Sequence, residues 1–133
     1  MGTKNAALIK RLEALEINAA AALVRFANDQ ESYIHILGSF VVHAPSFVKA
    51  AKAFENKDAS QNLNSYRITV HSIKSSVRSI GADTLGDMAE ELETAVKKGD
   101  IDFIKAHNNS LIEALEKLIN DLSACLDTLS EVK

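Results

Sequence analysis

The sequence predicts an all-α protein, arranged as an antiparallel up-down-up-down four-helix bundle with one or two short accessory helices at its amino terminus. Helix breakers are rare, since the 133 residues include one proline and five glycines. Apolar residues recur at spacings of three and four in four long segments. Short connections between such segments are typical of antiparallel neighbours in a bundle.

The amino-terminal part predicts two short helices followed by a long one. The short helices are expected over Thr3–Ala14 and Ala19–Phe26, before the turn-forming pair Asn28-Asp29. The first long helix is expected over Gln30–Phe54. Because Pro45 lies inside this segment and has no amide hydrogen, we expect a kink near residues 41–42. A turn and a cap are expected over residues 56–60.

The second long helix shows the most regular apolar spacing in the chain. Its stripe follows a 3-4-3-4-3 pattern typical of a bundle seam, formed by Leu63, Tyr66, Val70, Ile73, Val77 and Ile80. Gly81 is placed to end this helix in the left-handed conformation. Thr84 and Asp87 have the spacing of a capping box for the next helix.

The third and fourth long helices are separated by a second stop-and-start signal. The third is expected over Thr84–Lys98, and the last begins after Gly99-Asp100. Apolar residues, Cys125 among them, keep a seven-residue period along the last helix. The whole chain, residues 1–133, is therefore expected to form one domain, with accessory helices in residues 1–28 and the bundle in residues 30–130.

Composition excludes several function classes. The net charge of -3 argues against generic attraction to nucleic acid or to an anionic membrane. No cleavable signal and no run of roughly 18 apolar residues is apparent, so we expect no membrane association. A single cysteine, Cys125, cannot form an internal disulfide and suits a reducing cytoplasm as a buried apolar residue. A monomer is expected, because the amphipathic helices can cover one another.

The face of the second long helix opposite its apolar stripe carries a histidine among cations and small residues. At about 100° per residue, His71 lies roughly 130° from the centre of the stripe and should face solvent. Arg67, Lys74, Ser75 and Arg78 fall on the same side. Taken alone, an exposed histidine on a basic helix face is usually only a solvated residue.

The longer string around this histidine is more specific. His71-Ser-Ile-Lys74-Ser-Ser-Val-Arg78-Ser-Ile-Gly81-Ala resembles the active-site helix of the histidine-containing phosphotransfer (HPt) family. That family's pattern reads His, any residue, Leu or Ile, Lys, Gly, any, small, two variable positions, apolar, Gly. The resemblance extends from about Glu16 into the last helix. Two positions depart from the pattern: Ser75 replaces a usual glycine and Val77 a small residue, which leaves room for an altered partner preference.

The resemblance implies that the protein is an intermediate of a two-component phosphorelay. His71 would accept a phosphoryl group from the phospho-aspartate of a response-regulator receiver domain and pass it to another receiver aspartate. Lys74 matches the family's lysine and would stabilise the phosphoryl oxygens, while Arg67, Ser75 and Arg78 would contact the partner. A hybrid sensor histidine kinase is a further candidate partner. No cofactor is implied for this chain, and Mg²⁺ is expected on the receiver.

Other function classes have weaker support. The chain lacks a GxxxxGK[ST] phosphate loop, so we do not expect an enzyme with its own ATP site. A structural adaptor bundle without phosphotransfer chemistry remains the alternative. A metal-binding bundle would need inward ExxH motifs, which are not present. His35, His43 and His107 lack ligand spacing and are interpreted as structural or solvated.

Overall fold

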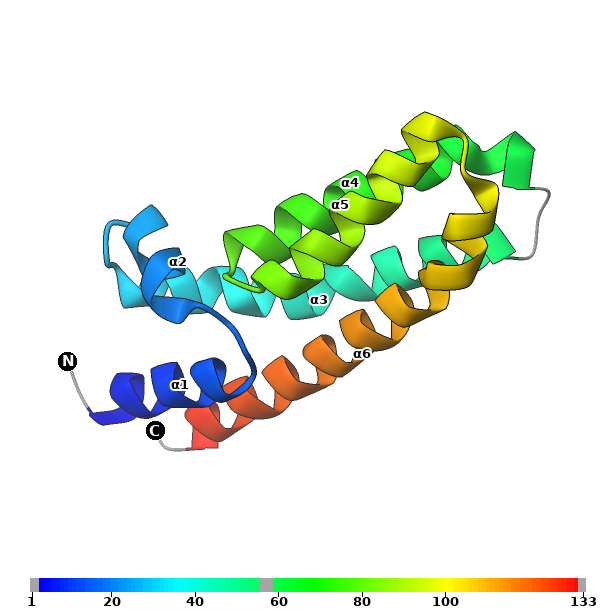
Figure 1. Cartoon of the computed structure of the whole chain (residues 1–133). Helices are drawn as coiled ribbons and strands as arrows, with labels where there is room; N and C mark the ends of the chain where they lie inside the picture. The colour runs from blue at the N-terminus through cyan, green and yellow to red at the C-terminus, as the bar shows by residue number, and fades with distance from the viewer. Residues whose placement is uncertain (1–2, 56–58, 132–133) are drawn as a thin grey trace.

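The structure is a computed structural model that describes residues 3–55 and 59–131. The described residues form helices and connecting turns, without a strand (Figure 1). The prediction of an all-α protein is therefore confirmed. The helices are α1 Thr3–Ala14, α2 Ala19–Arg25, α3 Gln30–Glu55, α4 Ala59–Ser79, α5 Asp83–Lys98 and α6 Ile101–Glu131.

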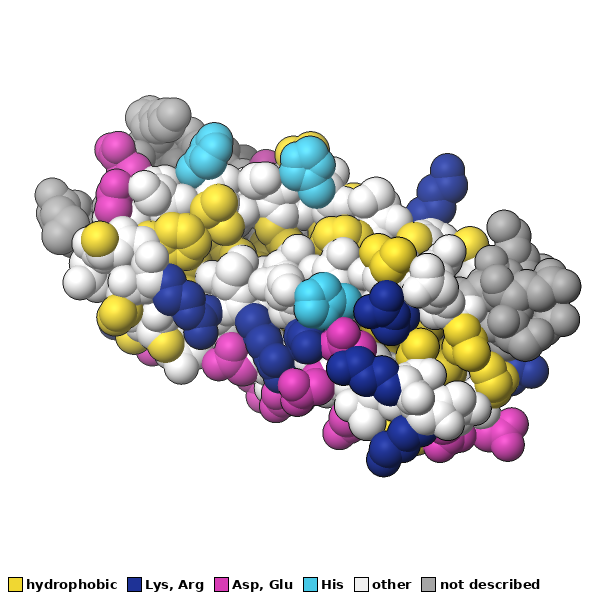
Figure 2. All heavy atoms as spheres, turned by 90° about the horizontal axis from the view of Figure 1, so that it is seen from above, with side chains coloured by type: hydrophobic (Ala, Val, Ile, Leu, Met, Phe, Trp, Pro, Cys, Tyr) yellow, Lys and Arg dark blue, Asp and Glu magenta, His cyan; other side chains and the backbone are white. Residues whose placement is uncertain are grey.

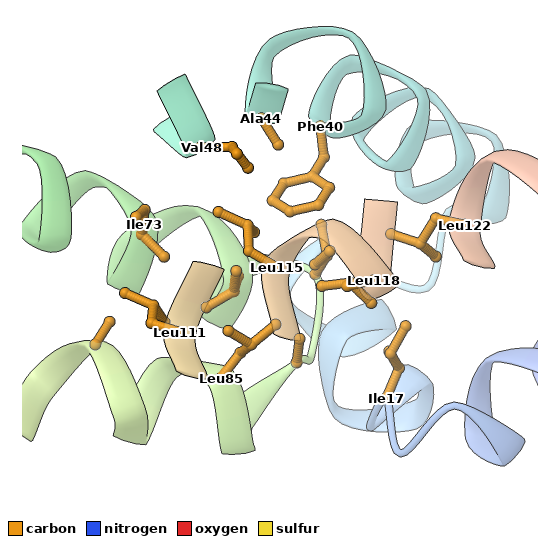
Figure 3. Close-up of a cluster of buried hydrophobic side chains, with 14 of the residues drawn as sticks. Ile17, Phe40, Ala44, Val48, Ile73, Leu85, Leu111, Leu115, Leu118 and Leu122 are labelled. Carbon is orange, nitrogen blue, oxygen red and sulfur yellow. The ribbon is translucent and has the colours of Figure 1, made fainter. Parts of the chain in front are cut away.

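The four long helices share one core. Helix α4 packs against α3 and α5, and α6 packs against α3 and α5, while α1 lies against α6 and α2 against α3. Figure 1 shows α1 and α2 at the end of the molecule where α4 meets α5. Figure 3 shows how side chains from different helices meet in the core, with Phe40 and Val48 of α3 facing Leu115 of α6. Burial of such side chains is the main favourable contribution to folding.

The apolar stripe of α4 lies where the sequence predicts it. Val70, Ile73, Val77 and Ile80 are fully buried, and Tyr66 is nearly so. Cys125 is buried on α6, also as predicted. The 3.6-residue period of the helix places these positions on one side, so the opposite side of α4 is left for other contacts.

The glycine signals for helix ends are confirmed, but the predicted capping box is wrong. Gly81 and Gly99 have φ values of +95° and +70°, and Asp100 Oδ1 accepts a hydrogen bond from the amide of Phe103 at 3.1 Å. Helix α5 begins one residue before Thr84, and its N-cap is Ala82, which makes no side-chain cap. The amide of Ala82 bonds to the carbonyl of Val77 at 2.8 Å, so the closing turn of α4 leads directly into α5. The turn predicted over residues 56–60 lies mostly outside the described residues.

The carboxyl end of α4 is held by donors from the amino-terminal part of the chain. The amide of Asn18 donates to the carbonyl of Gly81 at 2.8 Å, and the hydroxyl of Tyr33 donates to the carbonyl of Ile80 at 2.7 Å. The guanidinium of Arg25 donates to the carbonyl of Arg78. The Asn18 and Tyr33 contacts satisfy two carbonyls beyond the last turn of α4, and Arg25 adds a second donor to the Arg78 carbonyl, which also accepts from the amide of Gly81 at 3.1 Å.

A buried polar contact joins three helices near the other end of the bundle. Asn108 of α6 is fully buried; its amide nitrogen donates to the carbonyl of Ala51 at 3.0 Å, and its carbonyl oxygen accepts from the Tyr66 hydroxyl at 2.7 Å. Helices α3, α4 and α6 are thereby linked by directional bonds. Such a contact favours one register of the helices over others.

Helix α3 is more apolar than the sequence analysis predicted, since no apolar run of membrane-spanning length was expected. The stretch Gln30–Phe54 is long and apolar enough to cross a membrane by length and composition alone, and 28% of its apolar window is buried. The core helix of a soluble bundle passes the same test. In this fold Leu37, Phe40 and Ala44 of α3 lie in the shared core.

Candidate functional site

His71 lies on the solvent-facing side of α4. Its side chain is 57% exposed, whereas Val70 and Ile73 on either side are fully buried. The helical period that buries those neighbours directs the imidazole outward, as the sequence predicts.

A carboxylate from the neighbouring helix contacts both His71 and Lys74. Glu93 of α5 places Oε2 2.9 Å from His71 Nδ1 and Oε1 2.6 Å from Lys74 Nζ. The Glu93 side chain is only 7% exposed. Burial raises the pKa of Glu93, but the hydrogen bonds from Lys74 and His71 outweigh burial, so the net pKa is lowered. Glu93 is therefore ionised near neutral pH.

The charge on Glu93 determines the tautomer of His71. An ionised carboxylate can only accept hydrogen bonds, so the ring nitrogen that faces it, Nδ1, must carry the proton. In the neutral ring, Nε2 then keeps its lone pair. The site thus presents one nucleophilic nitrogen, Nε2, to solvent. The contact of Nδ1 with Glu93 fixes the orientation of the ring.

The three cations on this face of α4 are in different states. Lys74 is paired with Glu93. Arg78 pairs with Asp87 at 3.0 Å and with Glu90 at 3.4 Å, and hydrogen bonds to these two carboxylates raise the pKa of Arg78. Arg67 donates to the side-chain oxygen of Asn64 at 3.2 Å and forms no ion pair with any side chain that the structure describes. Of these three, Arg67 retains an uncompensated charge.

The geometry around His71 agrees with the result of a comparison with known families. The Hpt domain family matches residues 35–131, from the first turns of α3 to the end of α6. The chain belongs to the Hpt domain family. No curated protein and no solved structure matches it. Hpt domains are phosphotransfer carriers of phosphorelays and interact with response-regulator receiver domains.

The structure brings some of the predicted site residues of this Hpt domain together and separates others. His71 and Lys74 meet at Glu93, and exposed Ser75 and Arg67 lie one turn after and one turn before the histidine. The Arg78 side chain is instead tied to α5. Figure 2 shows the face on which histidine, basic and acidic side chains gather.

A glycine makes room for the Arg78 side chain. A Cβ atom at Gly86 would lie 2.5 Å from Cγ of Arg78, so the arginine stem crosses α5 directly above this glycine. The guanidinium thereby reaches the two carboxylates beyond. Contacts with α5, and not contacts near His71, therefore set the position of the Arg78 side chain.

Sequence reasoning missed Glu93, although one signal for it was present. The residue lies among the inward positions of α5, directly after buried Leu92 and four residues after buried Ala89. A carboxylate at a buried position of an amphipathic helix needs a partner. That partner is 22 residues away on another helix, so the packing of α4 on α5 was needed to identify it.

A metal site is not assembled around His71. No group of three or more His, Cys, Asp or Glu side chains suited to holding a metal ion occurs in the described ranges 3–55 and 59–131. Both oxygens of Glu93 already accept hydrogen bonds from His71 and Lys74. Glu93 thus holds the imidazole with one oxygen and the lysine ammonium with the other.

Proposed function

We propose that this Hpt domain carries a phosphoryl group on Nε2 of His71, accepting it from the phospho-aspartate of one receiver domain and passing it to the aspartate of another. The observation that supports this most directly is the Glu93 contact at Nδ1, which leaves Nε2 as the exposed nucleophile. The exposure of the ring allows a second protein to approach.

The proposed transfer is an in-line displacement at phosphorus. The lone pair of Nε2 forms the N–P bond while the P–O bond of the acyl phosphate breaks, and the carboxylate of the receiver leaves with the electron pair. The ring becomes more positive as the N–P bond forms. Ionised Glu93 at Nδ1 stabilises this charge without rearranging, and transfer to a second receiver reverses the same steps.

The neighbouring side chains have proposed roles that differ with their pairing. Lys74, one turn from His71, stabilises the phosphoryl oxygens. Arg67 contacts the receiver with its uncompensated charge, and Ser75 offers a small surface for close approach. Arg78 of α4, whose side chain is held against α5 by its ion pairs, contributes to partner binding. Magnesium is supplied by the receiver.

We further propose how the helices support the site and where the protein acts. Helices α3 to α6, residues 30–130, act as an up-down-up-down antiparallel scaffold for the site, and residues 1–28 are accessory helices of the same single domain. The protein works as a cytoplasmic monomer without nucleic acid or membrane contact, has no ATP site of its own, and exchanges phosphoryl groups with receivers, including that of a hybrid sensor kinase.

Phosphotransfer from labelled receivers tests the proposal. Purified wild type, His71→Gln and the matched control His107→Gln, at an exposed position of α6, are incubated with a panel of ³²P-labelled receiver domains and Mg²⁺. We expect acid-labile, base-stable label on the wild type and on His107→Gln only. Label on His71→Gln, or no label on wild type from any receiver, would contradict the proposal and favour an adaptor without phosphotransfer chemistry.

A further inference from the structure

A hollow lies beside the Lys74–Glu93 pair, between α4, the end of α5 and the start of α6. It encloses about 500 Å³, which lies within the range typical of small-ligand sites. Its walls include Lys74 from α4, Glu93 and Lys97 from α5 and Phe103 from α6. Figure 1 shows the turn between α5 and α6 at the end of the molecule away from α1 and α2. The hollow therefore shares two side chains with the site around His71, although His71 does not line it.

The hollow is lined by lysines that have unused hydrogen-bond donors. Lys97 and Lys98 occupy the last turn of α5, are exposed and form no ion pair within residues 3–55 and 59–131. Lys74 Nζ donates to Glu93 at 2.6 Å, and this ammonium has no further acceptor among the described residues. Because an ammonium group carries three N–H donors, Lys74 can bind another acceptor while it keeps its bond to Glu93. Two helices thus supply free donors to one hollow.

The other carboxylates of the hollow are mostly engaged. Glu90 pairs with Arg78 at 3.4 Å, and Asp100 accepts a hydrogen bond from an amide in the first turn of α6 at 3.1 Å. Glu91 is exposed and has no such partner in the part of the chain that the structure describes. The free cations therefore outnumber the free carboxylates. No set of three metal-ligating side chains occurs in the described ranges, so an anion fits the hollow better than a metal ion.

An aromatic ring adds an apolar wall to the hollow. Phe103 is half-buried, and its ring stacks on that of His107 with the centroids 4.0 Å apart and the planes at 22°. His107 Nδ1 donates to the carbonyl of Phe103 at 2.9 Å, because a carbonyl oxygen can only accept. These two contacts hold the pair of rings together. The Phe103 ring therefore offers a fixed surface on which a second flat group can stack.

Building on the proposed role of Lys74, we propose that this hollow binds a small phosphate monoester with an aromatic body, and that the bound ligand slows phosphotransfer at His71. A phosphate monoester carries roughly two negative charges, which match more than one lysine. It accepts hydrogen bonds from Lys74, Lys97 and Lys98. The aromatic body lies against Phe103.

The expected effect on transfer follows from the position of Lys74. This lysine lies three residues after His71, within one helical turn, and its charge is the one proposed to stabilise the phosphoryl oxygens. A phosphate bound to Lys74 in the hollow neutralises that charge. The ligand thus opposes the arrival of a phosphoryl group without touching the imidazole.

Titration of the ¹⁵N-labelled protein with phenyl phosphate tests the site directly. We expect amide resonances of residues 94–103 to shift with a dissociation constant of about 1 mM or below, which is reasonable for a ligand of this size. Lys97→Gln/Lys98→Gln should weaken binding about tenfold or more, since hydrogen bonds to charged groups are lost. The matched control Lys10→Gln/Arg11→Gln removes an adjacent pair of exposed cations from α1 and should bind as wild type does.

Two further titrations test the aromatic body. Inorganic phosphate supplies the charge without a ring and should bind wild type more weakly than phenyl phosphate does. Phe103→Leu should reduce this difference and leave the affinity for inorganic phosphate unchanged, while the spectrum shows whether the variant keeps the fold. If inorganic phosphate bound wild type as tightly as phenyl phosphate, the ring would not contribute and the proposed ligand class would be wrong.

Phosphotransfer in the presence of phenyl phosphate tests the coupling to His71. With a labelled receiver that phosphorylates wild type, saturating phenyl phosphate should lower the transfer rate several-fold in wild type and in Lys10→Gln/Arg11→Gln. Lys97→Gln/Lys98→Gln should keep the rate that it has without the ligand. Equal slowing of all three proteins would place the effect on the receiver, and an unchanged wild-type rate would show that the hollow does not regulate transfer.

The outcomes separate this inference from the proposed function. If no resonance shifts, or if Lys97→Gln/Lys98→Gln binds phenyl phosphate as wild type does, the hollow is not the ligand site, although His71 still carries phosphate. If wild type accepts phosphate from no receiver, the proposed function and the regulation fail together. The titration, which needs no receiver, then still decides whether the hollow binds the monoester.

Discussion

At the residue scale, the contact between Glu93 and His71 fixes the tautomer and the orientation of an exposed imidazole. A solvated imidazole exchanges its proton between two nitrogens and rotates about its side-chain bonds. Glu93 fixes both properties through one hydrogen bond of 2.9 Å, and Lys74 holds the carboxylate in place from its other oxygen. The chemistry of the site therefore depends on a residue of α5 as much as on α4.

Replacing Glu93 by glutamine should slow phosphotransfer. Glu93→Gln retains the size of the side chain but removes the charge that stabilises the ring as the N–P bond forms. We expect the transfer rate from a receiver to fall about tenfold or more. Rapid-quench measurement of label transfer checks this, with exposed Glu91→Gln on the same helix as the control. Equal rates in Glu93→Gln and wild type would show that the carboxylate is not needed.

The same carboxylate predicts a pH dependence of stability. The pKa of Glu93 is lower in the folded protein than its ordinary value of 4.5. Its stabilising contribution is therefore complete above about pH 4.5 and is lost as the pH falls through the folded-state pKa. The difference in unfolding free energy between wild type and Glu93→Gln should be larger at pH 7 than at pH 3. Urea titrations at both values measure it, and a constant difference would contradict the assignment.

The two arginines near the site should respond differently to substitution. Arg67→Ala removes an uncompensated charge, so we expect weaker receiver binding and nearly unchanged stability. Arg78→Ala breaks surface ion pairs with Asp87 and Glu90 and should lower the unfolding free energy by about 0.5–1 kcal/mol. Receiver titrations and urea denaturation of both variants provide the comparison. If Arg67→Ala lowered the unfolding free energy and Arg78→Ala did not, the stabilising contacts would belong to Arg67 and not to Arg78.

At the element scale, the sequence predicts α4 well because burial follows the helical period. The strict spacing of its apolar residues identifies the buried face, and His71 follows on the opposite one. The start of α5 was predicted one residue late because the capping of that helix depends on how the closing turn of α4 folds, and not on Thr84 alone. Glu93 could not be paired with His71 without knowing how two helices face each other.

The turn between α4 and α5 should be sensitive to any side chain at its glycine. Gly81 has φ +95°, and a Cβ atom there would lie 2.6 Å from the carbonyl oxygen of Asn18. Gly81→Ala should therefore lower the unfolding free energy by about 1–3 kcal/mol. Gly38→Ala is the control, because a Cβ there meets nothing within 4 Å and alanine favours helix by about 1 kcal/mol. Thermal denaturation should show opposite shifts, and a Gly81→Ala variant as stable as wild type would refute the strain argument.

At the scale of the whole molecule, the carboxyl end of α4, the helix that carries His71, is held by residues that precede the family match. The match begins at residue 35, whereas the donors to the last carbonyls of α4 come from Asn18, Arg25 and Tyr33. The accessory helices are therefore tied to the carboxyl end of the helix that carries His71.

Removing residues 1–28 should destabilise the molecule, and the effect should be largest at the carboxyl end of α4. The deletion removes the donors Asn18 and Arg25 together with buried core residues such as Leu12 and Ile17, and so uncovers the part of α6 that α1 contacts. Tyr33→Phe removes only the hydroxyl bond to Ile80 and should cost about 1 kcal/mol. We expect the deletion to lower the urea midpoint well beyond Tyr33→Phe, and amide hydrogen exchange to quicken first in the last turn of α4. A deletion variant with the wild-type midpoint and protected α4 amides would show that the bundle holds this helix end without its accessory helices.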